Sequence, residues 1–158
     1  AVNGVAAGAG ASLAFAADFR ILVDTAAFNT SFAGVALSCD TGASWTLPRL
    51  VGRAKAMELL YFPRTIPADE ALLLGLATQV VPAADFESAV GDLAARLAAG
   101  PTVALGSIRQ AVEHSAGHSF AESLAFEADK MALTGATEDH LAAVNAFLAK
   151  TKPVFSGR

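Results

Sequence analysis

Hydrophobic and polar residues follow two patterns along the chain. Up to about residue 85, short apolar runs alternate with polar breaks and with segments of helical spacing, a mixture that predicts strands and helices in turn. In the remainder of the chain the apolar residues recur at helical spacing alone, as Val90, Leu93 and Leu97 do. The pattern therefore predicts an α/β region over residues 1–85 and an all-helical region over residues 86–158.

The predicted strands are short apolar runs. Runs rich in β-branched and aromatic residues predict strands at residues 19–23, 27–29 and 78–81, and residues 1–3 are interpreted as the end of another strand. Three glycines between residues 4 and 10 predict a tight loop there, in which the backbone comes close to another group.

The predicted helices rest on apolar spacing and on residues typical of helix ends. Pro67 and the acidic residues after it begin one helix, and Gly75 follows its end. Ser119 and Glu122 have the spacing of a capping box, and Thr137 is the expected cap of the last helix. The predicted helices cover residues 12–17, 41–51, 53–61, 67–75, 87–99, 102–115, 120–133 and 137–150.

Composition and charge restrict the kinds of partner. The chain is 54% hydrophobic and 16% charged, with a mean hydropathy of +0.47. This apolar balance predicts a large core together with surface hidden against other subunits. The net charge is −4 and no block of Lys or Arg occurs, which excludes a nucleic-acid partner. No run of 18 apolar residues supports a membrane span.

The single cysteine and the first 17 residues indicate in which cellular compartment the protein is expected. The single cysteine, Cys39, cannot form an intrachain disulfide and fits a reducing cytosol, so we expect a cytoplasmic protein. Residues 1–17 are small and apolar but lack an initiating Met and a basic segment, which argues against a signal peptide. The chain starts inside an apolar segment without a preceding cap or turn, and we predict that it is truncated.

Five segments in order resemble the crotonase superfamily, the enoyl-CoA hydratase/isomerase family. The segments are AVNGVAAGAG (1–10), ADFRI (17–21), GASWTLPRLVG (42–52), IPADEA (66–71) followed in register by GLATQVVP (75–82), and FLAKTKPVF (147–155). The resemblance implies the C-terminal part of a crotonase (ClpP/crotonase-like) ββα spiral followed by trimerisation helices. It also implies an acyl-CoA thioester as substrate, no separate cofactor, no metal, and a homo-oligomer, either a trimer or a hexamer.

The glycine-flanked turn Gly8-Ala9-Gly10 is the first candidate site. A thioester enolate needs two backbone N–H groups aimed at its oxygen, and a turn that begins a helix can supply one of them. By resemblance, the N–H of Ala9 is the second oxyanion donor, and Gly8 and Gly10 line the substrate pocket. The alternative is a packing turn between strand and helix. The resemblance places the first donor in the N-terminal part of the family's subunit, outside this chain.

Ser12 and Phe32 fall where hydratases of this family carry two glutamates that hold the attacking water. Neither residue can act as a carboxylate base, so hydration by the two-glutamate mechanism is not expected. The resemblance places both in the substrate pocket. Their alternatives are a small helix residue for Ser12, and a core residue or pocket wall for Phe32.

Asp40 is the strongest catalytic candidate. It precedes a predicted helix together with Gly42, which the resemblance places in the substrate pocket. The alternative for Asp40 is an N-cap aspartate. By resemblance, isomerases of the phenylacetate-degradation type use this aspartate as a proton-shuttling base, and chlorobenzoyl-CoA dehalogenase uses it as a nucleophile. Burial near Phe32 and Trp45 would raise the pKa of the Asp40 carboxyl toward useful base strength. The predicted mechanism is a 1,3-proton shift on an enoyl-CoA.

Phe147 and Lys150 match family positions that contact coenzyme A, with the lysine near a phosphate. The alternative is an ordinary helix C-terminus. Arg49 is expected to pair with a nearby carboxylate or carbonyl. The three histidines are predicted to be surface residues, without zinc-ligand spacing.

Four functions therefore stay open at the level of sequence. They are an isomerase that uses Asp40, a hydratase-like lyase that activates water with Asp40 alone, a dehalogenase or thioesterase with Asp40 as nucleophile, and a non-catalytic subunit that binds coenzyme A thioesters. For the 158 residues alone we predict no activity, because the first oxyanion donor lies elsewhere.

Overall fold

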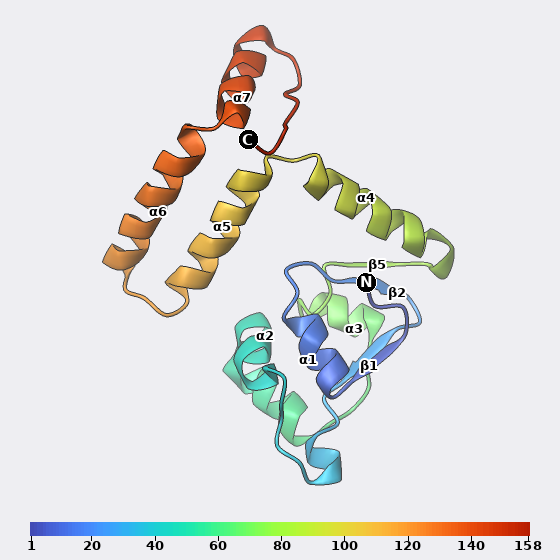
Figure 1. The fold of residues 1–158 in the computed structure, drawn as a ribbon. Helices are drawn as coiled ribbons and strands as arrows, with labels where there is room; N and C mark the ends of the chain where they lie inside the picture. The colour runs from blue at the N-terminus through green and yellow to red at the C-terminus, as the bar shows by residue number, and fades with distance from the viewer. The chain divides into compact units, whose positions relative to one another are not determined.

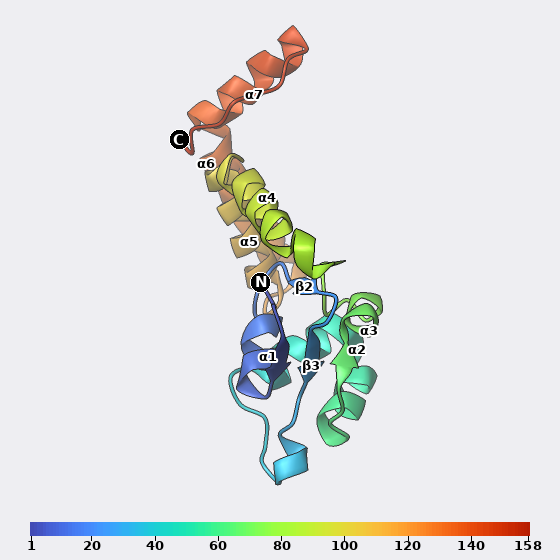
Figure 2. The same cartoon turned by 90° about the vertical axis from the view of Figure 1, so that its right-hand side faces the viewer.

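The computed structural model describes all 158 residues and divides into two compact units, Ala1–Gly91 and Asp92–Arg158. Each unit is described by itself, as the ribbons of Figures 1 and 2 show. Strands occur only in the first unit, and helix α4 (Phe86–Ala98) crosses the boundary. The sequence pattern predicts the boundary between the α/β region and the helical region after residue 85. That this is a domain boundary in the whole protein stays a prediction.

The first unit is built on two small sheets. One has the strand order β1-β3-β4, with β1 parallel to β3 and β3 antiparallel to β4. The other pairs β2 with β5 in parallel, and Val2 adds a single bridge to Leu22 of β2. The strands are β1 (Val5–Ala7), β2 (Ile21–Val23), β3 (Ala27–Asn29), β4 (Ile66–Pro67) and β5 (Gln79–Val81).

Three of the predicted strands are confirmed, with β2 and β5 shorter than expected. The prediction of a loop across residues 4–10 is wrong in part, because Val5–Ala7 forms β1 and pairs with β3. Two of these residues are alanines, which have little preference for strands, so pairing with a strand some twenty positions later decides their conformation. Only the end of the segment, at Gly8, is a turn.

The helices of the first unit pack against these sheets. They are α1 (Ala9–Phe15), α2 (Ala43–Tyr61) and α3 (Ala68–Leu73), with short 3-10 turns η1 (Ala33–Val35) and η2 (Ala83–Asp85). Figure 2 shows α1 and α3 on opposite sides of β1 and β3. Gly52, at φ 76° and ψ 158°, kinks α2 between the two helices predicted there. Gly75, at φ 74°, follows the end of α3 as predicted.

The core of the first unit joins α1, α2 and the strands. Its largest fully buried side chains include Phe28, Leu22, Leu47, Leu59, Ile66 and Leu76. The rings of Phe15 and Phe28 lie 5.0 Å apart between centroids. Arg20 is buried as well, and its Nε donates to the carbonyl of Leu76 at 2.7 Å while its guanidinium also donates to the carbonyl of Ala17. Desolvation by burial lowers the pKa of the Arg20 guanidinium, and the charge of Asp18 partly offsets this.

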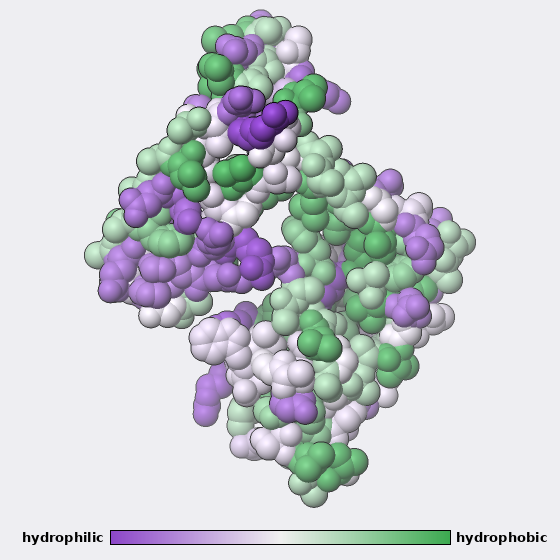
Figure 3. Space-filling model, viewed as in Figure 1, coloured by the Kyte–Doolittle hydropathy of each residue, from purple (hydrophilic) through white to green (hydrophobic).

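The second unit is helical. Helices α5 (Thr102–Ser115) and α6 (Phe120–Gly135) lie side by side as a hairpin, and α7 (Glu138–Ala149) follows (Figure 1). The predicted capping box of Ser119 and Glu122 is confirmed. Thr137 caps α7 as predicted, accepting from the N–H of His140 at 3.1 Å. Figure 3 shows hydrophilic residues gathered on one face of the α5–α6 hairpin. No helix of the structure combines the length and the apolar character that crossing a membrane requires.

Candidate functional site

The turn between β1 and α1 is built around Gly8. Its φ of 53° and ψ of −119° belong to a region that residues with a Cβ rarely adopt. The N–H of Gly8 donates to the carbonyl of Asn29 in β3 at 2.9 Å. A Cβ at Gly8 would lie 3.7 Å from the ring of Phe32. The parallel pairing of β1 with β3 therefore ends in a turn that only glycine fits, with an aromatic ring against it.

Ala9 begins α1 directly after this turn. It is exposed, and its N–H donates to no acceptor within the chain. The first N–H groups of a helix have no partner inside the helix, and the N-cap Gly8 has no side chain that could accept from them. The N–H of Ala9 therefore has no acceptor within the chain, and its role as an oxyanion donor stays a prediction.

Ser12 and Phe32 lie beside this turn. Ser12 is 0% exposed, and its hydroxyl donates to the carbonyl of Gly8 at 3.1 Å. Phe32 is 9% exposed and contacts the Gly8 position. The structure therefore brings three predicted pocket residues together around the N–H of Ala9. The hydroxyl of Ser12 is a donor within this turn, and neither side chain is a base.

Asp40 lies in the exposed segment between η1 and α2. Its carboxylate accepts from the hydroxyl of Thr41, and its backbone carbonyl accepts from the N–H of Ala43 at 3.1 Å. The N-cap of α2 is Gly42, at φ 86°, and no side chain caps this helix. The alternative of an N-cap aspartate is therefore wrong, because Asp40 stands two residues too early.

The predicted burial of Asp40 is also wrong for this chain. Asp40 is exposed, and no residue from Ala33 to Gly42 is buried. Trp45 is 57% exposed, and the guanidinium of Arg49 lies 3.2 Å from the centroid of its ring. Arg49 also donates to the carbonyl of Trp45 at 2.9 Å, which confirms the carbonyl partner expected for it.

Phe147 and Lys150 belong to the second unit. Phe147 is 82% exposed, in the last turn of α7. Lys150 is exposed at the C-cap of the same helix, with a φ of 55°. The structure places these two residues together at one helix end, and it does not relate them to the turn at Gly8.

Sequence reasoning missed the role of Asp139. This residue is buried in the first turn of α7, and its carboxylate accepts from the N–H of Ser156 at 2.7 Å and of Gly157 at 3.0 Å. Its own N–H donates to the carbonyl of Arg158 at 2.8 Å. An acidic residue in a first turn indicates favourable helix-dipole interaction, and nothing in the sequence indicates that the carboxylate binds the end of the chain.

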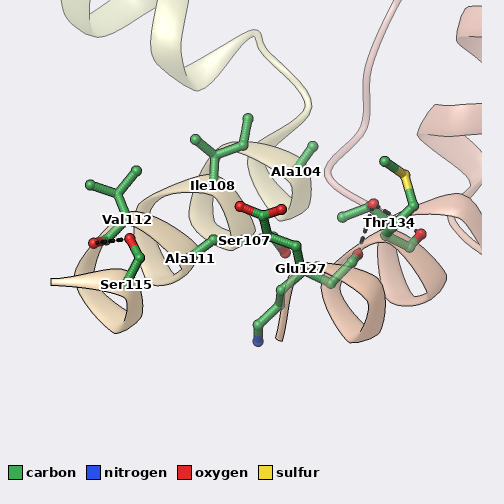
Figure 4. Close-up of a pocket in the computed structure, with 10 residues that line it drawn as sticks. Ala104, Ser107, Ile108, Ala111, Val112, Ser115, Glu127 and Thr134 are labelled. Carbon is green, nitrogen blue, oxygen red and sulfur yellow. Dashed lines mark hydrogen bonds between the residues drawn. The ribbon is translucent and has the colours of Figure 1, made fainter. Parts of the chain in front are cut away.

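A groove of about 410 Å³ runs between α5 and α6 (Figure 4). Ala104, Ile108 and Ala111 line it from α5, and Glu127 and Thr134 from α6. Sequence spacing predicted these helices but not the groove between them. It contains none of the predicted site residues.

Near the turn between α5 and α6, the half-buried ring of His114 stacks between two other rings. Its centroid lies 3.7 Å from that of His118 and 4.2 Å from that of Phe126. His118 and His140 are exposed as predicted, whereas His114 is a packing residue. The structure holds no group of three or more His, Cys, Asp or Glu residues placed to bind a metal ion.

A strand–turn–helix with a free N–H at the helix start occurs in many folds and by itself defines no activity. The family model described as enoyl-CoA hydratase/isomerase matches residues 1–158. The chain therefore belongs to the enoyl-CoA hydratase/isomerase family, and the predicted crotonase fold is confirmed.

Individual relatives agree with this assignment. The chain is 42% identical over 158 residues to a probable enoyl-CoA hydratase of Rhodobacter capsulatus, covering 100% of this chain and 62% of that protein. It is 40% identical over 158 residues to the 1,2-epoxyphenylacetyl-CoA isomerase of Escherichia coli, covering 100% of this chain and 60% of that protein. A crystallised enoyl-CoA hydratase/isomerase-type protein of Mycobacterium abscessus superimposes with a TM-score of 0.94 at 40% identity, over 98% of this chain and 60% of that one. The chain thus spans about three fifths of the length of these relatives.

Proposed function

We propose that the whole protein acts on an acyl-CoA thioester and moves its carbon–carbon double bond by way of an enolate. The observation that carries the proposal is the unpaired N–H of Ala9, held at the end of a turn built from Gly8, Ser12 and Phe32. Such a donor stabilises the negative oxygen that forms when a thioester loses a proton from a neighbouring carbon. An acyl-CoA substrate is supported by family membership and by two relatives, one named a probable enoyl-CoA hydratase and the other a 1,2-epoxyphenylacetyl-CoA isomerase.

Asp40 is the proposed base. Its carboxylate is not used as a helix cap and is open to a substrate. It would remove an α- or γ-proton from an enoyl-CoA, so that the electron pair delocalises to the thioester oxygen. The N–H of Ala9 would donate to that oxygen, together with a second donor in the part of the relatives that this chain does not span. Asp40 would then return the proton at the other carbon, and no atom is gained or lost.

The neighbours of Ala9 favour isomerisation over hydration. Hydration requires a bound water and a base that takes its proton. The hydroxyl of Ser12 donates a hydrogen bond to the carbonyl of Gly8, and Phe32 presents an apolar ring. One carboxylate is enough for a 1,3-proton shift, because the same group takes and returns the proton.

Coenzyme A binding is proposed for the end of α7. Phe147 offers a large exposed ring and Lys150 an exposed ammonium group, three residues apart at the C-terminus of this helix. An ammonium group is a point charge suited to phosphate, and an exposed aromatic ring offers apolar area for the rest of the molecule.

A homo-oligomer, a trimer or a hexamer, is proposed for the whole protein. The second unit exposes large apolar side chains on α5, α6 and α7, among them Ile108, Met131 and Leu148. Large apolar patches on a surface are typical of protein–protein interfaces. A monomer in light scattering of the whole protein would contradict the proposal.

A second candidate is a hydratase-like lyase in which Asp40 alone activates water. The solvent-exposed carboxylate and the hydratase among the relatives favour it. It differs from the isomerase in product, since hydration gives a 3-hydroxyacyl-CoA and isomerisation gives only a shifted double bond.

The test is to incubate the whole protein with a 3-enoyl-CoA and a 2-enoyl-CoA, and to compare wild type with Asp40→Asn. Double-bond migration that disappears in Asp40→Asn supports the isomerase. A 3-hydroxyacyl product supports the lyase instead. Thioester hydrolysis, or an ester trapped on Asp40, indicates a nucleophile of the dehalogenase or thioesterase type. Binding without turnover indicates a non-catalytic subunit, and each of the last three outcomes overturns the isomerase.

A further inference from the structure

The peptide group between Gly8 and Ala9 carries both the free N–H and an anchored carbonyl. A peptide group is planar, and its C=O and N–H point in opposite directions. The carbonyl of Gly8 accepts from the N–H of Ser12 at 3.0 Å and from the hydroxyl of Ser12 at 3.1 Å. The two hydrogen bonds from Ser12 fix the direction of the Gly8 carbonyl. Because the peptide group is planar, they also fix the direction of the Ala9 N–H.

Gly8 makes this anchoring necessary. Its φ of 53° lies where glycine is the only comfortable residue, and glycine is also the residue whose peptide planes turn most freely. The Gly8 N–H is held by Asn29, which fixes the preceding plane but not the one that follows. The hydrogen bond from the Ser12 N–H to the Gly8 carbonyl would form with any non-proline residue at position 12. Only the hydrogen bond from the hydroxyl depends on the serine side chain.

We infer that Ser12 is a positioning residue for the oxyanion donor, and that its hydroxyl both aims and strengthens the N–H of Ala9. This inference rests on the proposed role of that N–H. Hydrogen bonds to a carbonyl polarise the amide and make its N–H a better donor. Ser12 is 0% exposed and has its hydroxyl committed to this carbonyl, so it acts through the Gly8–Ala9 peptide without touching the substrate.

The second unit contains a matched control. Ser123 stands four residues after the N-cap of α6, as Ser12 does after the N-cap of α1, and both its N–H and its hydroxyl donate to the carbonyl of Ser119 at 2.9 Å. Ser123→Ala therefore removes the same kind of hydrogen bond from a helix start that has no proposed role in the reaction.

The test follows the thioester carbonyl directly. Butanoyl-CoA labelled with 13C at its carbonyl cannot isomerise, and isotope-edited infrared spectra report the hydrogen bonding of that carbonyl when it is bound to the whole protein. We expect a band shifted to lower frequency in wild type, a smaller shift in Ser12→Ala, an intermediate one in Ser12→Cys, whose thiol is a weak donor, and the wild-type shift in Ser123→Ala.

Kinetics supply the second readout. With a 3-enoyl-CoA, Ser12→Ala should lower kcat about tenfold while KM changes little, since misaiming a donor affects the transition state more than binding. An equal band shift in Ser12→Ala and wild type, or an equal kcat, overturns this inference alone and leaves the Ala9 donor standing. An unshifted carbonyl in wild type overturns the Ala9 donor and the inference together.

Discussion

Helices α1 and α6 begin in opposite ways. The hydroxyl of Ser119, the N-cap of α6, accepts from the N–H of Glu122, and the carboxylate of Glu122 accepts from the N–H and hydroxyl of Ser119. The N-cap of α1 is Gly8, which offers no side-chain acceptor, and the N–H of Ala9 stays unpaired. The capping box of α6 satisfies the N–H of Glu122, whereas at the start of α1 no side chain accepts from any of the first three N–H groups.

The two starts are otherwise alike. In each, a serine four residues after the N-cap donates its N–H and hydroxyl to the N-cap carbonyl. The two starts differ in the side chains at the N-cap and at the third helical residue, which form a capping box in α6 and are Gly8 and Ala11 in α1. Four changes test this comparison.

The largest effect is expected from Gly8→Ala. A Cβ at φ 53° and ψ −119° is strained, and the new methyl would lie 3.7 Å from the ring of Phe32. The turn should relax and misdirect the N–H of Ala9, lowering kcat with a 3-enoyl-CoA by about 100-fold, the usual cost of losing an oxyanion donor. Steady-state kinetics of the whole protein measure this.

Gly106→Ala is the control for that change. Gly106 lies inside α5, and a Cβ there would meet nothing within 4 Å. Alanine should leave kcat unchanged and raise the free energy of unfolding by about 0.5–1 kcal/mol. If Gly8→Ala kept the wild-type kcat, the turn at Gly8 and the N–H of Ala9 would have no part in the reaction.

Elements bounded by local signals could be predicted from the sequence. Helix α5 was predicted with its observed bounds, because Gly100 and Pro101 precede it and its apolar residues keep helical spacing. The capping box of α6 was also predicted, since its two partners lie three residues apart. Local spacing is enough when the interacting groups are close in sequence.

Features that depend on distant pairing could not be predicted. Strand β1 forms among small residues because β3 pairs with it, and Asp139 is buried because the chain end returns to it from 17 residues away. For the candidate site, the free N–H of Ala9 was expected, whereas the exposure of Asp40 was not, because no local pattern shows which elements cover a loop. The oxyanion role of Ala9, the catalytic role of Asp40 and the coenzyme A contacts of Phe147 and Lys150 stay predictions.

The next largest effect is expected at the other end of α1. Arg20 donates to the carbonyl of Ala17, just after this helix, and to that of Leu76 before β5. Arg20→Met would leave the buried carbonyl of Leu76 without this donor, and should lower the free energy of unfolding by roughly 3 kcal/mol. Denaturant unfolding measures it, with the exposed Arg53→Met as control, expected within about 0.5 kcal/mol of wild type. Equal losses in both variants would mean that the buried guanidinium does not anchor α1.

Asp139→Asn tests a third kind of helix start, in which a first-turn carboxylate binds the chain end instead of its own helix. The asparagine side chain has a single acceptor oxygen, so it cannot replace both carboxylate oxygens that accept from the N–H groups of Ser156 and Gly157. The free energy of unfolding of the second unit should therefore fall by about 2 kcal/mol, the size of hydrogen bonds to a charged group. The N–H groups of Ser156 and Gly157 should exchange faster with solvent. Glu138→Gln, at the exposed neighbouring position, should not change them. Unchanged exchange in Asp139→Asn would show that other contacts hold the chain end.

The smallest effect is expected when pH changes the charge of Glu122 in the capping box of α6. Hydrogen bonds from the hydroxyl and then the N–H of Ser119, with smaller contributions from the charges of His118 and His114, lower the pKa of Glu122. A carboxyl whose pKa is lower in the folded state adds stability above its unfolded pKa, about 4.3, and loses it as pH falls through the folded value. The protection of the first-turn amides of α6 against exchange, measured relative to an unfolded chain at the same pH, should therefore fall below about pH 4. Glu122→Gln, which keeps an acceptor that does not titrate, should lack this change. The free N–H of Ala9 has no such partner, so its exchange should follow ordinary base catalysis over the same range; matching pH responses at the two starts would remove the difference between them.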